Sequence, residues 1–115
     1  MLFVCGPYAS GKRSYVRSLG YSDAVMSDEI GSDAPVLVDL EQVLRAGDLS
    51  PEDFECVLSK DVVIMCEVGG GITPLDPEDR AWRDRVGRCA QELARRADRV
   101  CRLVCGIPIC LKEES

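Results

Sequence analysis

The sequence contains no histidine, and only 5% of its 115 residues are aromatic. The first absence excludes any reaction step that depends on an imidazole, such as transfer through a histidine nucleophile. The second means that a core must be built mainly from Val, Leu, Ile, Ala and Cys. Because 46% of the residues are hydrophobic, the chain has the apolar side chains of a globular domain, and its composition argues against disorder.

The sequence also lacks a CxxC pair among its seven cysteines, so it does not predict a zinc site. Several of the cysteines stand in apolar runs, which is typical of free thiols and indicates a reducing cytoplasm. We expect neither a membrane span nor a signal peptide, because the apolar start of the chain is short and has no basic flank. The formal net charge of −6 argues against nucleic acid or an anionic membrane as a partner.

Four apolar runs have the length and the flanking turn residues of buried strands. They lie at residues 2–5, 36–40, 61–68 and 100–105. Four helices are expected between them, at residues 11–20, 41–46, 50–59 and 77–97, and the acidic segment 21–35 is expected to be a loop. This alternation predicts one α/β domain over residues 1–115, a three-layer sandwich with a small mostly parallel sheet. The edges of so small a sheet favour self-association.

The segment CGPYASGKRSY, residues 5–15, matches the P-loop pattern G-x-x-x-x-G-K-[ST] up to its last position. In such a loop, backbone N–H groups wrap around a phosphate, the following helix adds partial positive charge, and the lysine reaches the outer phosphates. We therefore predict a nucleotide site, the alternative being a glycine-rich turn without a ligand. The candidate residues are Gly6, Ala9, Ser10, Gly11, Lys12, Arg13 and Ser14.

Arg13 stands where the pattern has the hydroxyl that binds Mg²⁺, and a guanidinium has no lone pair to give to a metal. Ser14 follows one position later, turned about 100° around the helix, and is a poor substitute unless the helix start shifts. Arg13 would either contact phosphate itself, partly replacing the charge of the ion, or point to solvent. The change therefore bears more on catalysis than on binding.

Two carboxylates, Asp39 and Glu67, come at the ends of predicted strands, where open α/β folds bind their ligands. Asp39 either holds Mg²⁺, directly or through water, or caps the helix that begins at Glu41. Glu67 precedes a run of three glycines and is either an exposed side chain in a turn or a second carboxylate for metal or substrate. With Ser14, they are the candidate Mg²⁺ ligands.

The C-terminal half carries EVGGGITP, RAWRDRVGRCAQELARRADRV and VCGIPICLK in this order. Together with the P-loop and Val38-Asp39, these segments resemble the adenosylcobinamide kinase/adenosylcobinamide-phosphate guanylyltransferase family over residues 2–14 and 36–112. The resemblance implies a P-loop NTPase-like (RecA-like) fold, ATP or GTP as phosphate donor, a corrinoid substrate, a role in cobalamin biosynthesis and assembly into trimers. By matched position, the catalytic residues would be Lys12, Asp39 and Glu67.

The chain departs from the family pattern in ways that bear on activity. The family transfers GMP through a histidine, so that step should be absent here. The segment between Lys12 and Asp39 is shorter than in the family, which would remove a helix and part of the pocket. Arg13 replaces the hydroxyl residue, and Cys66 and Ala90 each replace an asparagine.

Three hypotheses follow. The first is a shortened family member that binds a nucleoside triphosphate and keeps weak kinase activity. The second is a non-catalytic nucleotide-binding or regulatory paralogue. The third is an ATPase-like protein or a kinase of another small molecule.

Overall fold

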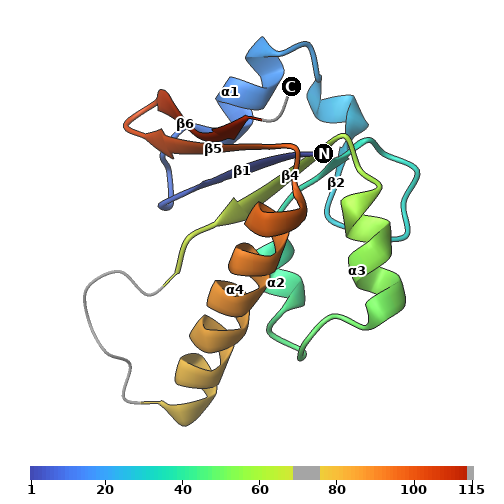
Figure 1. Ribbon diagram of the computed structural model, residues 1–115, viewed down its shortest axis with the longest axis vertical. Helices are drawn as coiled ribbons and strands as arrows, with labels where there is room; N and C mark the ends of the chain where they lie inside the picture. Colours follow the sequence, from blue (N-terminus) through green and yellow to red (C-terminus); the bar gives the residue numbers. More distant parts are fainter. Residues whose placement is uncertain (69–75, 114–115) are drawn as a thin grey trace.

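A computed structural model describes residues 1–68 and 76–113 of the chain. Its centre is a six-stranded sheet with the strand order β2-β3-β4-β1-β5-β6 (Figure 1). The strands are β1 (Leu2–Gly6), β2 (Met26–Ser27), β3 (Val36–Leu37), β4 (Val62–Cys66), β5 (Arg99–Val104) and β6 (Ile107–Glu113). The helices are α1 (Lys12–Ser18), α2 (Leu40–Val43), α3 (Pro51–Leu58) and α4 (Pro77–Arg96), with a 3₁₀ turn, η1 (Asp23–Val25).

The sheet is parallel except at one edge. β1 pairs in parallel with β4 and β5, and β3 and β2 continue in parallel beyond β4. β6 runs antiparallel to β5. The predicted α/β class and mostly parallel sheet are therefore confirmed.

The expectation of about four strands is wrong, because the described residues contain two more. β2 has only two residues and lies in the segment that was expected to be a loop. β6 is exposed over most of its length. β2 is too short to show the apolar run by which a buried parallel strand is recognised in a sequence, and the apolar residues of β6 lie on the surface instead of in the core. The predicted break at residues 69–71 lies outside the described residues.

Helices cover both faces of the sheet, as the apolar strands require (Figure 1). Phe3 and Met65 pack on the face that carries α2, α3 and α4. Val4 and Ile64, their neighbours on the same strands, pack on the opposite face with Val16 of α1. Side chains of β1 and β4 thus alternate between two separate clusters of the core.

Two helices follow their sequence signals closely. α3 is capped by Ser50, whose Oγ accepts a hydrogen bond of 3.1 Å from the Asp53 N–H, with Pro51 in the first turn, a typical helix start. α4 lies within the predicted range, and its buried residues, Trp82, Val86 and Leu93, have the spacing of one helix face. α1 and α2 are shorter than predicted, with seven and four residues.

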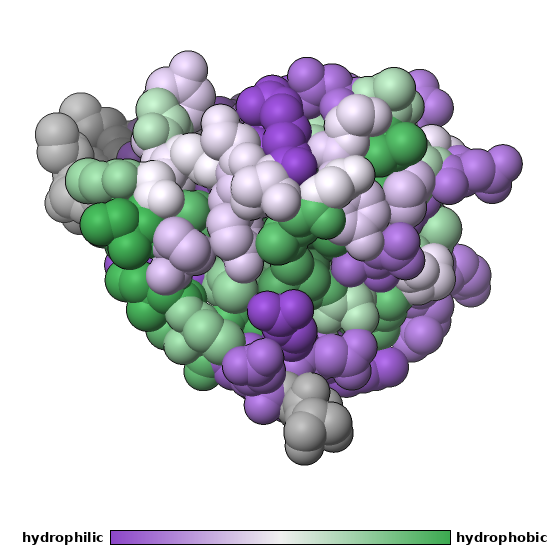
Figure 2. Space-filling model, turned by 90° about the horizontal axis from the view of Figure 1, so that it is seen from above, coloured by the Kyte–Doolittle hydropathy of each residue, from purple (hydrophilic) through white to green (hydrophobic). Residues whose placement is uncertain are grey.

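β6 is an open edge of the sheet with apolar side chains on its surface. Ile107, Ile109 and Leu111 are 64%, 44% and 59% exposed. Figure 2 shows hydrophobic side chains gathered on the side of the molecule where this strand lies. An edge of this kind fits the expectation of self-association, which stays a prediction. Among the described residues, no helix has both the length and the apolar composition needed to cross a bilayer.

Candidate functional site

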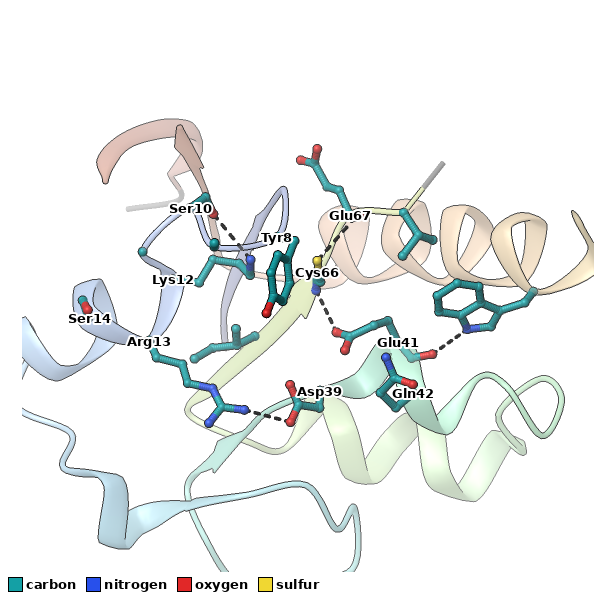
Figure 3. A pocket seen from close by; sticks show the side chains of 15 residues that line it. Tyr8, Ser10, Lys12, Arg13, Ser14, Asp39, Glu41, Gln42, Cys66 and Glu67 are labelled. Atoms are coloured by element: carbon teal, nitrogen blue, oxygen red, sulfur yellow. Dashed lines mark hydrogen bonds and ion pairs between the residues drawn. The ribbon is translucent and has the colours of Figure 1, made fainter. Parts of the chain in front are cut away.

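A cavity of about 700 Å³ opens at the carboxyl ends of β1, β4 and β3, three neighbouring parallel strands (Figure 3). The chain leaves β1 toward α1 on one face of the sheet, and the helices that follow β3 and β4 cover the other face. A divergence of this kind creates the crevice in which open α/β sheets bind ligands. Of the predicted site residues, all but Gly6 line the cavity.

Gly6 and Gly11 determine the path of the loop between β1 and α1. At Gly6, φ is +150° and a Cβ would lie 2.6 Å from the Leu103 carbonyl oxygen. At Gly11, φ is +92° and a Cβ would lie 3.3 Å from the Gly106 Cα. Both positions therefore favour glycine strongly, which gives the sequence pattern a physical reason. Ala9 is also left-handed, with φ of +57°.

Lys12 lies against this loop. Its Nζ donates to the Pro7 carbonyl oxygen at 2.6 Å and to Ser10 Oγ at 3.4 Å, so the ammonium group is held beside the loop backbone. Because α1 has only seven residues, its macrodipole is small, and the positive charge at this end of the cavity comes from Lys12 and Arg13.

The turn between β5 and β6 supports the loop from the other side. The Gly106 N–H donates to the Ser10 carbonyl oxygen at 2.8 Å. Cys105 and Gly106 both have positive φ, of 51° and 79°, which makes the tight hairpin that brings the N–H there. The Gly-x-Pro segment noted in the sequence, residues 106–108, therefore buttresses the P-loop candidate.

Arg13 and Asp39 form an ion pair at the cavity (Figure 3). Arg13 Nη2 donates to Asp39 Oδ2 at 2.8 Å, and the two side chains are 47% and 45% exposed. Asp39 has φ of +58°, and its carboxylate makes no capping hydrogen bond to α2. Asp39 therefore stands at the N-cap position of α2, but its side chain pairs with Arg13 instead of capping the helix. Arg13 is held by a carboxylate rather than extending freely into solvent.

Glu67 is paired as well, with an arginine that the sequence reading missed. Arg102 Nε and Nη2 donate to the two carboxylate oxygens of Glu67 at 2.7 and 2.9 Å. These hydrogen bonds lower the pKa of the Glu67 carboxyl, against the opposing effect of burial, and keep it ionised at neutral pH. An arginine inside the apolar run of β5 was the available signal, since a charge there needs a partner.

Glu41 is the second missed residue, and it lies in the wall of the cavity with only 5% exposure. Its Oε1 accepts from the Cys66 N–H at 2.8 Å, and its backbone oxygen accepts from Trp82 Nε1 at 2.7 Å (Figure 3). It therefore ties α2 to the end of β4 and to α4. Burial raises the pKa of the neighbouring Cys66 thiol, which favours its neutral form.

The donor set does not fit a preformed Mg²⁺ site. Asp39 and Glu67 each accept from an arginine, and Arg13 has no lone pair to offer. Ser14 Oγ lies on α1 within 3.4 Å of Arg17 Nη1, apart from both carboxylates (Figure 3). Within residues 1–68 and 76–113, no three Cys, Asp or Glu side chains are grouped to hold a metal. The predicted ligands Asp39, Glu67 and Ser14 stay a prediction that requires both ion pairs to open.

The remaining substitutions noted in the sequence lie in different places. Cys66 lines the cavity, whereas Ala90 lies on α4 and packs against the core. Gln91, beside it, lines a second cavity of about 600 Å³ between α4 and the start of α3. Of the two positions where the family has an asparagine, Cys66 therefore lies at the cavity and Ala90 does not.

Residues 48–111 match the sequence model of a known family, cobinamide kinase/cobinamide phosphate guanyltransferase. The match covers more than half of the chain and includes Glu67, Arg102 and the hairpin turn. The P-loop candidate and Asp39 lie before the matched residues. No curated protein matches the chain.

Proposed function

The chain belongs to the cobinamide kinase/cobinamide phosphate guanyltransferase family, and on that premise we propose that its cavity binds the phosphates of ATP or GTP. The observation that carries the proposal is the loop of residues 6–12. It has the glycines, the lysine and the place at the carboxyl end of a central parallel strand that phosphate binding requires. The backbone of residues 9–14 and the Lys12 ammonium would contact the phosphates, and Gly6 and Gly11 would hold the loop in the path that brings its backbone there.

In this proposal, residues 1–115 form one P-loop NTPase-like domain of three layers that acts in cobalamin biosynthesis. Its phosphate acceptor would be a corrinoid, by family membership. We expect phosphoryl transfer to be slow, because catalysis of this step depends on neutralising charge in a fixed geometry. Asp39 and Glu67, the proposed catalytic carboxylates beside Lys12, are both engaged by arginines. Guanylyl transfer should be absent because the chain has no histidine.

A second candidate is a non-catalytic nucleotide-binding or regulatory module. The observation that favours it is the pairing of both carboxylates with arginine, which leaves neither free for a metal. The two candidates share nucleotide binding and differ in turnover. Phosphorylation of adenosylcobinamide by the purified protein, followed with labelled ATP or GTP, separates them.

Calorimetric titration with ATP and GTP tests the shared part. We expect Lys12→Ala to weaken binding by roughly tenfold or more, because it removes a charge-assisted contact to phosphate. Arg17→Ala is the matched control, since Arg17 is a cation on the same helix that is already paired with Asp23. Equal losses in the two variants, or no binding by the unmodified protein, would contradict the proposal.

We further propose that the protein is a homo-oligomer, with three subunits as the family resemblance implies, and that it is located in the cytoplasm. The exposed apolar edge at β6 supports association, and all seven cysteines are free thiols, as a reducing compartment requires. Light scattering measures the mass of the particle. Ile109→Lys, at an exposed position of β6, should lower that mass if this edge is the interface.

A further inference from the structure

We infer that Arg13 takes the place of Mg²⁺ at the nucleotide phosphates, so that binding needs no metal and proceeds by displacing Asp39 from Arg13. The inference rests on the proposed nucleotide binding and deepens it. It makes Asp39 a competitor of the phosphate rather than a ligand of a metal.

Arg13 lies where the P-loop pattern places a metal ligand. It directly follows Lys12 and lines the same cavity, at the place where the P-loop pattern presents a metal-binding hydroxyl. A guanidinium carries a permanent positive charge and offers N–H groups in a planar fork that matches phosphate oxygens. Arg13 therefore supplies charge where a hydroxyl would have bound a cation.

The ion pair between Arg13 and Asp39 is accessible to an incoming ligand. The pair lines both the central cavity and a neighbouring cavity of about 410 Å³, so it forms part of the wall between them. One hydrogen bond of 2.8 Å joins the two side chains, and each side chain is about half exposed to solvent. Exposed ion pairs of this kind contribute little free energy, so an anion that binds more tightly can displace the Asp39 carboxylate from the guanidinium.

Asp39 and a bound phosphate would compete for the Arg13 guanidinium. A phosphate carries more negative charge than a carboxylate and binds arginine through charge-assisted, often bidentate hydrogen bonds. Once phosphate occupies Arg13, the freed Asp39 carboxylate lies beside another anion and is repelled. Removing the Asp39 charge should therefore strengthen binding, whereas removing a metal ligand would weaken it.

The experiment is calorimetric titration with ATP and with GTP, in excess MgCl₂ and in excess EDTA. We expect the dissociation constants of the unmodified protein to agree within about threefold between the two conditions. Arg13→Ser should weaken binding in EDTA by roughly tenfold or more and should make it depend on Mg²⁺. Asp39→Asn should tighten binding in EDTA by a few fold.

Arg17→Ser is the matched control, because Arg17 lies one turn further along α1 and pairs with Asp23 at 2.8 Å. It should change the affinity less than about twofold. Arg13→Lys keeps the charge without the fork, so it should retain metal-free binding more weakly than the unmodified protein. If Arg13→Ser fails to fold in a thermal scan, Arg13→Lys and Asp39→Asn still test the inference.

Binding that occurs only with Mg²⁺ would overturn the inference and leave the proposed function intact. Weaker binding by Asp39→Asn would also overturn it, because that result assigns Asp39 to a metal. Absence of binding in every condition would overturn the proposed function as well. These outcomes are distinct in one set of titrations.

Discussion

Two arginine–carboxylate pairs flank the same cavity, and they come from different parts of the chain. Glu67 and Arg102 lie within the residues matched to the family and share two hydrogen bonds, of 2.7 and 2.9 Å. Arg13 and Asp39 lie before those residues and share one, of 2.8 Å. The first pair joins the end of β4 to β5 across β1, so it fixes strands. The second joins α1 to a loop, so it can open without disturbing the sheet.

The two regions of the chain contribute different properties to the cavity: one holds its shape and the other supplies its positive charge. The matched part of the chain supplies α4, β5 and the hairpin turn, which hold the cavity in shape. The part before it supplies the loop, Lys12 and Arg13, which provide the positive charge in the lining. Family membership therefore supports the frame of the site more directly than it supports the chemistry performed there.

The largest effect on stability is expected at Gly6, where the part of the chain before the matched residues contacts β5. Gly6→Ala should lower the free energy of unfolding by about 3 kcal/mol, because the new Cβ would lie 2.6 Å from the Leu103 oxygen of β5. Gly20→Ala is the control, with φ of +106° and no atom within 4 Å, and should cost about 1 kcal/mol. Urea denaturation measures both. Equal losses would mean that positive φ alone, without the contact, explains the requirement for glycine.

The next effect tests the two pairs directly. Double-mutant cycles with Glu67→Gln and Arg102→Met should give the larger coupling in the free energy of unfolding. The corresponding cycle with Arg13→Met and Asp39→Asn should give about 0.3 kcal/mol, because a single exposed contact is weaker than a bidentate one. Couplings in the reverse order would contradict the assignment of the first pair to structure and the second to ligand exchange.

Local rules explain why much of the site could be predicted from the sequence. Gly6, Gly11 and Lys12 act within one loop, and their pattern follows from the path of the backbone after β1. Asp39 and Glu67 follow parallel strands, and parallel strands end at the same edge of a sheet. The order of strands and helices along the chain was therefore enough to predict that these residues lie near one cavity. The roles of these residues stay predictions.

Partners distant in the sequence could not be predicted, because they depend on strand order and register. Arg102 reaches Glu67 because β4 and β5 flank β1 in the register that brings the end of β4 near Arg102. Asp39 had a local interpretation as a helix cap, but the ion pair with Arg13 prevailed. The contact of Gly106 with Ser10 likewise requires the exposed strand β6, which carries no buried apolar run.

The smallest effect is a pH dependence that belongs to the first pair. Arg102 lowers the pKa of Glu67 from its ordinary value of 4.5. A carboxyl whose pKa is lower in the folded protein contributes stability above its unfolded pKa and loses it as the pH falls through the folded pKa. The Arg102→Met variant should therefore be less stable than the unmodified protein above pH 5, and the difference should shrink as the pH falls toward 3.

Urea denaturation across this pH range measures the difference, and Glu67→Gln provides the control. In the Glu67→Gln variant, Arg102→Met should lower the free energy of unfolding by the same amount at every pH, because no carboxylate remains there to titrate beside the guanidinium. A difference in the unmodified background that persists unchanged to pH 3 would assign the contribution of Arg102 to the packing of its aliphatic stem. The contrast between the two pairs would then rest on side-chain packing in β5 rather than on the bidentate hydrogen bond.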